Sequence, residues 1–186
     1  MRKVIVFNNV SLDGFFVDSQ GDMGWAHQQD PEWIAFAADN AQGDCVFVYG
    51  RVTHDMMAAW WPTPQAIQAM PVVANQMNTL PKIVFSKTLR RSPWNNTTVI
   101  GSDPVAAIGR MKQEAGDPLL IMGSGSIVAS LAQAGLIDEY QIVVHPLVLG
   151  TGRTLFEGVK DRLSLRLTES RAFKNGNVFL RYERAA

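Results

Sequence analysis

Glycine, hydroxyl-bearing and cationic residues gather at three places in the sequence, each directly after a short apolar run: residues 50–53, 86–87 and 123–126. Glycine lets a ligand approach the backbone closely, and arginine, lysine and hydroxyl groups bind phosphate oxygens. Where a helix follows, its first N–H groups add partial positive charge. Each place alone is equally typical of a tight turn or an ordinary helix cap, but three of them on one sheet favour a ligand that carries phosphate. The residues concerned are Gly50, Arg51, Thr53, Ser86, Lys87, Gly123, Ser124, Gly125 and Ser126.

Other chemistries find little support in the sequence. The three histidines, His27, His54 and His145, are far apart, and Cys45 is the one cysteine. The sequence therefore predicts no metal site and no internal disulfide. It contains neither a Gly-x-Ser-x-Gly nucleophile motif nor a Walker lysine.

Strand and helix patterns alternate along the chain, as expected of the elements that must hold these residues. Short β-branched and aromatic runs predict strands at 4–7, 45–49, 83–85, 97–100, 119–122 and 140–144. Helices are predicted from Pro31, over 53–59, from Pro104 and over 127–134, and residues 62–81 form a partly helical stretch punctuated by prolines. Alternating runs around Asn175-Gly176 predict a closing hairpin within 163–182. The sequence therefore predicts an α/β fold with a mixed, mostly parallel central sheet, helices on both faces and an antiparallel hairpin at the end.

The composition limits the class of protein. The 186 residues are 47% hydrophobic and 18% charged with no formal net charge, which fits a single domain over residues 1–186 and favours neither a nucleic-acid nor a membrane partner. The N-terminal apolar stretch is too short for a signal peptide, and no run approaches the about 20 apolar residues of a membrane span. We therefore expect a cytoplasmic protein. Residues 8–24, rich in Asn, Asp, Ser and Gly, are expected to form a long polar loop after the first strand.

Four segments, taken together, carry a resemblance to a known family: NVSLDGFF, YGRVTHDM, VFSKTL and IMGSGSIVASLAQAGLIDEYQIVVHPLVLGTGRTLF. They resemble the dihydrofolate reductase-like superfamily, and most closely its branch named for the C-terminal reductase domain of riboflavin biosynthesis. The resemblance covers nearly the whole chain. It implies a dihydrofolate reductase-like fold that binds NADPH.

The same resemblance implies roles for the three clusters. Residues 50, 51 and 53 match the family's Gly-Arg-x-Thr, residues 86–87 match the segment that contacts the adenosine 2′-phosphate, and residues 123–126 match the glycine turn under the pyrophosphate. The family turn begins Gly-Gly with a cis peptide, and Ser124 in the second position leaves that geometry open. A Cβ at Gly125 is expected to block the pyrophosphate and leave the fold intact.

The resemblance also suggests residues on the substrate side. Residues 23–25, with Trp25, resemble the mobile loop over the active site, and Asp30 falls at the spacing of the family's single buried acid. Asp30 is alternatively the cap of a helix that begins at the next residue. Asp13 matches a loop signature of this branch, or it stabilises a turn. Trp60 walls a pocket for a flat heterocycle, or it belongs to the core.

We therefore expect an NADPH-dependent reductase that transfers a hydride to a small pyrimidine-like or pteridine-like heterocycle. No arginine is placed to hold a folate glutamate tail, so folate is not the first expected substrate. The alternative is a non-catalytic nucleotide-binding or assembly module that keeps the fold. Relatives in this branch pair, and the apolar strands near the C-terminus need cover, so we also expect a homodimer.

Overall fold

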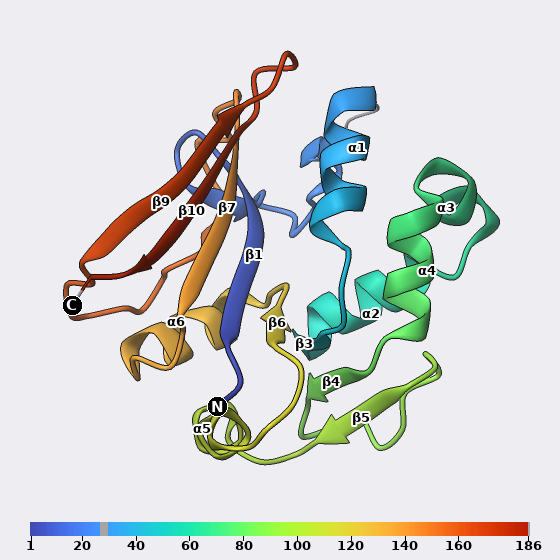
Figure 1. The fold of residues 1–186 in the computed structure, drawn as a ribbon, viewed down its shortest axis with the longest axis vertical. Coiled ribbons are helices and arrows are strands. Elements are labelled where there is room, and N and C mark those ends of the chain that lie inside the picture. The colour runs from blue at the N-terminus through green and yellow to red at the C-terminus, as the bar shows by residue number, and fades with distance from the viewer. Residues whose placement is uncertain (27–29, 186) are drawn as a thin grey trace.

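The computed structural model describes residues 1–26 and 30–185. An eight-stranded sheet in the order β5-β4-β3-β6-β1-β7-β10-β9 forms its centre (Figure 1). The first six strands in this order are mutually parallel, and β10 pairs antiparallel with both β7 and β9. The predicted mixed, mostly parallel sheet with its closing hairpin is confirmed. The strands are β1 Val4–Ser11, β3 Val46–Gly50, β4 Lys82–Phe85, β5 Thr97–Ile100, β6 Leu119–Ile121, β7 Glu139–His145, β9 Leu165–Ala172 and β10 Val178–Arg184.

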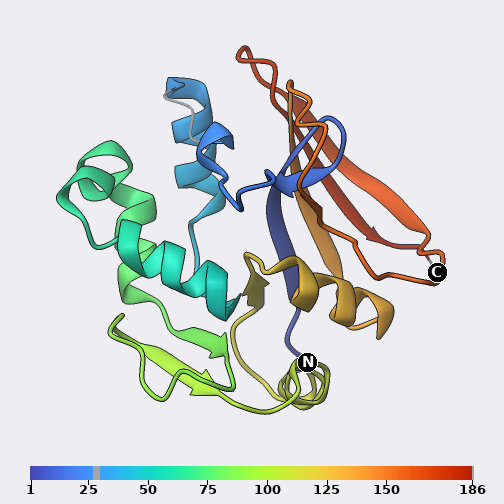
Figure 2. The same ribbon diagram turned by 180° about the vertical axis from the view of Figure 1, so that it is seen from behind.

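Helices cover both faces of the sheet, because successive side chains of each buried strand point to opposite faces. Phe7 and Phe47 face α1, α2 and α4, whereas Val6 and Val48 belong to a second core with α5 and α6 (Figure 2). Large apolar side chains therefore alternate between two cores, one on each face. The helices are α1 Pro31–Asn40, α2 Arg51–Trp60, α3 Pro64–Ala69, α4 Pro71–Thr79, α5 Pro104–Gln113 and α6 Gly125–Gln133.

The first strand is longer than the sequence predicts. β1 continues through two asparagines to Ser11, and it pairs with β7 in register from Ile5 opposite Glu139 to Ser11 opposite His145. The expected polar loop over 8–24 is therefore wrong at its start. Asparagine has a low strand propensity, but pairing and burial within the sheet outweigh it. The remainder contains β2 Phe15–Val17, which pairs with β8 Arg153–Thr154, and a 3-10 turn at Gly24–Ala26.

Prolines begin helices where the sequence left the structure ambiguous. Pro64 and Pro71 occupy the first positions of α3 and α4, so residues 62–81 hold two short helices. α2 and α6 each begin two residues before their predicted starts, directly at Arg51 and Gly125. Their N-termini therefore lie immediately at the ends of β3 and β6. No helix among the described residues is long and apolar enough to cross a membrane.

Candidate functional site

A pocket of about 320 Å³ lies at the carboxyl ends of β3, β4, β5 and β6, and we call it the strand-end pocket. It brings together the three clusters that the sequence singles out. Three cationic side chains and four serines line it, which suits an anionic ligand with several phosphate groups. Its lining residues are Gly50, Arg51, Val52, Phe85, Ser86, Lys87, Gly101, Ser102, Pro104, Ser124, Ser126, Ile127 and Arg153.

The N-termini of α2 and α6, which open onto this pocket, lack the side-chain caps that α1, α3 and α5 have. The side chains of Asp30, Thr63 and Asp103 each accept a hydrogen bond from an N–H in the first turn of α1, α3 and α5. The equivalent residues of α2 and α6, Gly50 and Ser124, make no such bond. Backbone N–H groups in the first turns of α2 and α6 are therefore left for a ligand.

Three of the nine predicted residues lie beneath the strand-end pocket and do not line it. Thr53 is buried, and a Cβ added at Gly123 would lie 3.0 Å from the Thr53 Oγ1. Thr53 therefore packs against the glycine turn and is not the ligand donor that the sequence suggests. Gly123 has a φ of 109°, and the Gly123–Ser124 peptide is cis. Gly125 packs closely against the ring of Phe16.

Gly125→Ala is expected to destabilise the fold by about 1–3 kcal/mol, in addition to any effect on ligand binding. A Cβ at this position would lie 2.7 Å from Cε1 and 2.9 Å from Cζ of the buried Phe16 ring. The expectation of an undisturbed fold is therefore wrong. Urea denaturation should show a lower midpoint for Gly125→Ala. Phe16→Leu should recover part of that loss in the double variant, and strictly additive losses would contradict the contact.

Arg51 reaches the pocket from the first turn of α2, where it is held by an acid one turn later. Its Nε lies 2.5 Å from Oδ2 of Asp55, and both side chains are about half exposed. Partial burial raises the pKa of Asp55, but hydrogen bonds from Arg51 and from the buried His54 ring outweigh burial and bring it below its ordinary value. The ion pair occupies one edge of the guanidinium, and the other N–H donors remain free to bind a phosphate.

Arg153 is a pocket cation that sequence reasoning missed. It lies at the start of β8, after the glycine-rich turn at 150–152, and its guanidinium carbon is 5.9 Å from the centre of the Phe16 ring. Because Phe16 also packs against Gly125, Arg153 lies on the Gly125 side of the pocket. The only sequence signal was an arginine directly after Gly-Thr-Gly. No local pattern linked that turn to the distant strand ends.

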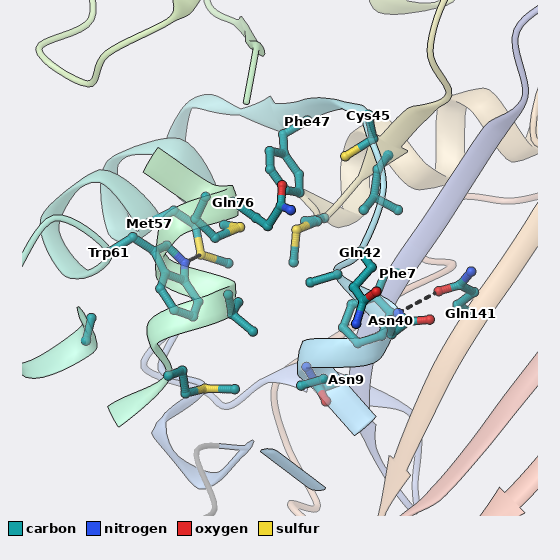
Figure 3. A pocket seen from close by; sticks show the side chains of 18 of the residues that line it. Phe7, Asn9, Asn40, Gln42, Cys45, Phe47, Met57, Trp61, Gln76 and Gln141 are labelled. Atoms are coloured by element: carbon teal, nitrogen blue, oxygen red, sulfur yellow. Dashed lines mark hydrogen bonds between the residues drawn. The ribbon is translucent and has the colours of Figure 1, made fainter. Parts of the chain in front are cut away.

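A second pocket, of about 330 Å³, lies between α1, α2 and α4 and the face of the sheet that carries Phe7 and Phe47 (Figure 3). We call it the apolar pocket. Six of the chain's eight methionines line it, together with Trp33, Trp60 and Trp61. Thioether and indole side chains favour a flat, weakly polar ligand. The prediction that Trp60 walls a pocket is thereby met in the geometry, although its role toward a substrate remains a prediction.

The other substrate-side residues lie elsewhere. Asp13 accepts hydrogen bonds from the Ser11 hydroxyl and from the N–H groups of Leu149 and Gly150, so it joins two loops and lines neither pocket. The Ser11 hydroxyl and these N–H groups hold the pKa of Asp13 below its ordinary value. Asp30 caps α1, where its Oδ1 accepts the Trp33 N–H at 2.8 Å. Trp25 packs edge-on against the His145 ring at 5.3 Å and is not among the pocket-lining residues.

One polar corner of the apolar pocket is formed by Asn9, whose orientation is fixed by a buried histidine. The Nε2 of His145 lies 2.9 Å from the Oδ1 of Asn9, and its Nδ1 has no partner among the described residues. Burial lowers the pKa of His145 to about 4, so the ring is neutral near pH 7. The neutral ring then donates from Nε2 to Asn9 Oδ1, and the Asn9 amide N–H groups are left for a ligand.

A second polar corner is formed by Asn40 and Gln141. The Nε2 of Gln141 donates to Oε1 of Glu139 at 2.7 Å, and the Nδ2 of Asn40 donates to Oε1 of Gln141 at 3.1 Å. A carboxylate can only accept, so Glu139 fixes which way both amides face. Arg181 and Lys3 hold Glu139 in turn, at 3.3 Å and 3.5 Å. Figure 3 shows Asn40, Gln141 and Asn9 on the same side of the pocket.

Two segments of the chain, α2 and residues 122–124, contribute lining residues to both pockets. The first turn of α2 lines the strand-end pocket through Arg51, and its second turn lines the apolar pocket through Met56 and Met57. Likewise Met122 lines the apolar pocket and Ser124 lines the other. α2 and the segment after β6 therefore each border both pockets. Among residues 1–26 and 30–185, no group of three or more His, Cys, Asp or Glu side chains could hold a metal ion.

Comparison with known proteins identifies relatives over the full length of the chain. The RibD C-terminal domain family matches residues 2–179. The uncharacterized Bacillus subtilis protein YyaP is 28% identical over 181 residues, covering 97% of this chain and 94% of YyaP.

Solved structures confirm the fold. A protein from Shewanella sp. PV-4, provisionally named a riboflavin biosynthesis protein, superimposes with a TM-score of 0.74 at 24% identity, covering 99% of both chains. The Thermotoga maritima diaminohydroxyphosphoribosylaminopyrimidine deaminase/5-amino-6-(5-phosphoribosylamino)uracil reductase has a TM-score of 0.67 at 14% identity, covering 99% of this chain and 57% of that one. At these identities the likeness is one of fold.

Proposed function

The chain belongs to the RibD C-terminal domain family, and we propose that it is a reductase that transfers a hydride from NADPH, held in the strand-end pocket, to a pyrimidine-like or pteridine-like heterocycle in the apolar pocket. The observation that supports this most is the pairing of the two pockets. One joins two helix N-termini without side-chain caps to three cations, and the other is lined by methionine and tryptophan side chains. α2 lines both of them.

The residues of the strand-end pocket fit a dinucleotide with an extra phosphate. Arg51 and Lys87, with the Ser86 hydroxyl, would bind the adenosine 2′-phosphate. The first-turn N–H groups of α6, with Ser126 and Arg153, would bind the pyrophosphate. When bound, the nicotinamide supplies the hydride. The chain's own contribution is to hold the two ligands in adjoining pockets and to exclude bulk water from the apolar one.

Reduction of a carbon–nitrogen or carbon–carbon double bond also needs a proton. Asp30 is occupied as a helix cap, and Asp44 is the one acid among the described residues that line the apolar pocket, where it lies exposed at the edge. His145 is neutral near pH 7 because burial lowers its pKa to about 4, so its one N–H, which is donated to Asn9, is not acidic enough to protonate a substrate. We therefore assign proton delivery to water bound at the amide corner formed by Asn9.

The absence of a placed acid in the described part of the apolar pocket also favours the second candidate, a nucleotide-binding module without turnover. NADPH oxidation, followed by absorbance across a panel of pteridines and aminopyrimidines, separates the two. Turnover of any of these compounds supports the reductase. NADPH binding by calorimetry without turnover of any of them would support the module and contradict the reductase.

We also propose that the protein is a homodimer. β9 is one of the two edge strands of the sheet, it is largely exposed, and Leu167 is half exposed on it. Its other exposed side chains are mainly polar, so pairing through the strand backbone would contribute more than apolar cover. Light scattering should give twice 20.5 kDa at micromolar concentration. Leu167→Lys should weaken the dimer, and a wild-type monomer would contradict the proposal.

A further inference from the structure

We infer that the apolar pocket takes a neutral, unphosphorylated heterocycle whose polar edge is that of a cyclic amide, an inference that rests on the proposed function. It concerns the class of substrate. The reductase part of the Thermotoga maritima protein is named for a substrate that carries a phosphoribosyl group. The charges around the apolar pocket of the present chain do not suit such a group.

The apolar pocket contains no cation among the described residues. None of its lining residues is Lys, Arg or His, and its one charged member is the carboxylate of Asp44. A phosphate placed there would lose its hydration without gaining a positive partner, and it would be repelled by Asp44. A neutral ring has no charged group that must lose its hydration there or that Asp44 would repel.

The strand-end pocket provides a direct comparison within the same molecule. The two cavities differ little in size, at about 330 and 320 Å³, but the strand-end pocket carries Arg51, Lys87 and Arg153. Among the described residues that line the two pockets, the cationic groups therefore all lie on the proposed cofactor side. The contrast between the pockets is one of charge and not of volume.

Three neutral amides of the apolar pocket, those of Asn9, Asn40 and Gln141, have orientations fixed by their hydrogen bonds. His145 donates to the Oδ1 of Asn9, which leaves the Asn9 N–H groups as donors. The Nε2 of Gln141 donates to Glu139, so its Oε1 faces Asn40 and accepts a hydrogen bond from the Asn40 Nδ2. This arrangement leaves the Asn40 Oδ1 as an acceptor. One donor and one acceptor match the carbonyl and N–H of a cyclic amide, the edge found in uracil-type and pteridinone rings.

A matched pair of compounds tests the inference: 5-amino-6-(ribosylamino)uracil and its 5′-phosphate, which differ only in the phosphate. Binding is followed by quenching of tryptophan fluorescence, since Trp60 and Trp61 line the pocket. Saturating NADP⁺ is present to occupy the strand-end pocket and to prevent hydride transfer. The unphosphorylated compound should bind at least about tenfold more tightly. Equal or tighter binding of the phosphorylated compound, or binding of neither compound, would overturn the inference.

Two variants at one position sharpen this test. Gln76 lines the pocket from α4 and is partly exposed, so Gln76→Lys introduces a cation and Gln76→Met a neutral side chain of similar size. The lysine variant should reduce the ratio of the affinities for the unphosphorylated and the phosphorylated compound by about threefold or more, and the methionine variant should leave this ratio unchanged. No narrowing with lysine would contradict the inference. In a separate assay with NADPH in place of NADP⁺, binding of the unphosphorylated compound without NADPH oxidation would contradict the proposed function and leave the inference standing, so the two failures are distinguishable.

Discussion

NADPH is expected to bind this protein about 100-fold more tightly than NADH. The two cofactors differ by one 2′-phosphate, which carries close to two negative charges near neutral pH. Arg51 and Lys87 reach the strand-end pocket from the ends of two different strands, and Ser86 lines the same pocket. A charge-assisted hydrogen bond contributes about 1.5–3 kcal/mol, and both cations are exposed, so we take the lower limit for each. Two such bonds correspond to about a 100-fold difference.

Three alanine variants separate the phosphate that distinguishes the cofactors from the phosphates that they share. Arg51→Ala and Lys87→Ala should each weaken NADPH about tenfold and leave NADH nearly unchanged. Arg153→Ala is the matched control, because it lies on the Gly125 side and should weaken both cofactors alike. Calorimetric titration of both cofactors gives the dissociation constants. Equal wild-type affinities, or equal losses of both cofactors in Arg51→Ala, would sink the assignment.

The strand-end pocket was largely predictable from the sequence for a physical reason. Carboxyl ends of parallel strands meet at one edge of a sheet, so polar residues that follow separate strands must gather there. Residues 50–51, 86–87 and 126 could therefore be placed together before any contact was known. What the sequence could not resolve was which side of a turn each residue faces. Thr53 and Gly125 lie beneath the pocket because packing against Gly123 and Phe16 decides their direction.

The apolar pocket was much less predictable. Its walls come from segments between Ile5 and Gln141, and no spacing rule links methionines that lie on two helices and on three connecting segments. Trp60 could be proposed because a large aromatic side chain suits the wall of a pocket for a flat ring, but the same reasoning did not show that Trp25 packs on His145 instead. Asn9 was hidden by the expectation of a loop, since a strand with two asparagines reads as a turn. Pairing of β1 with β7 brings Asn9 into the pocket wall.

The buried His145 is expected to make the protein about 3 kcal/mol less stable at pH 4 than at pH 7, beyond the effect of all other groups. Its ring is fully buried, and its described contacts, Asn9, Trp25 and Trp33, carry no charge. Burial therefore lowers its pKa from 6.5 to about 4. Between these values the unfolded chain binds a proton that the folded protein does not. The contribution of the neutral His145 to the free energy of unfolding is thus fully present above pH 6.5, and it is lost as the pH falls toward the folded pKa of about 4.

Urea denaturation of wild type and His145→Gln across this pH range isolates the histidine, because every other titrating group is shared. Glutamine can still donate to Asn9 Oδ1, so the polar corner is kept while the titration is removed. The free energy of unfolding of wild type minus that of His145→Gln should fall by about 3 kcal/mol between pH 7 and pH 4. Should the variant fold poorly, an NMR titration of the wild-type ring reads the pKa directly. A midpoint near 6.5, or parallel pH profiles for the two proteins, would contradict the lowered pKa of His145 and the loss of stability predicted from it.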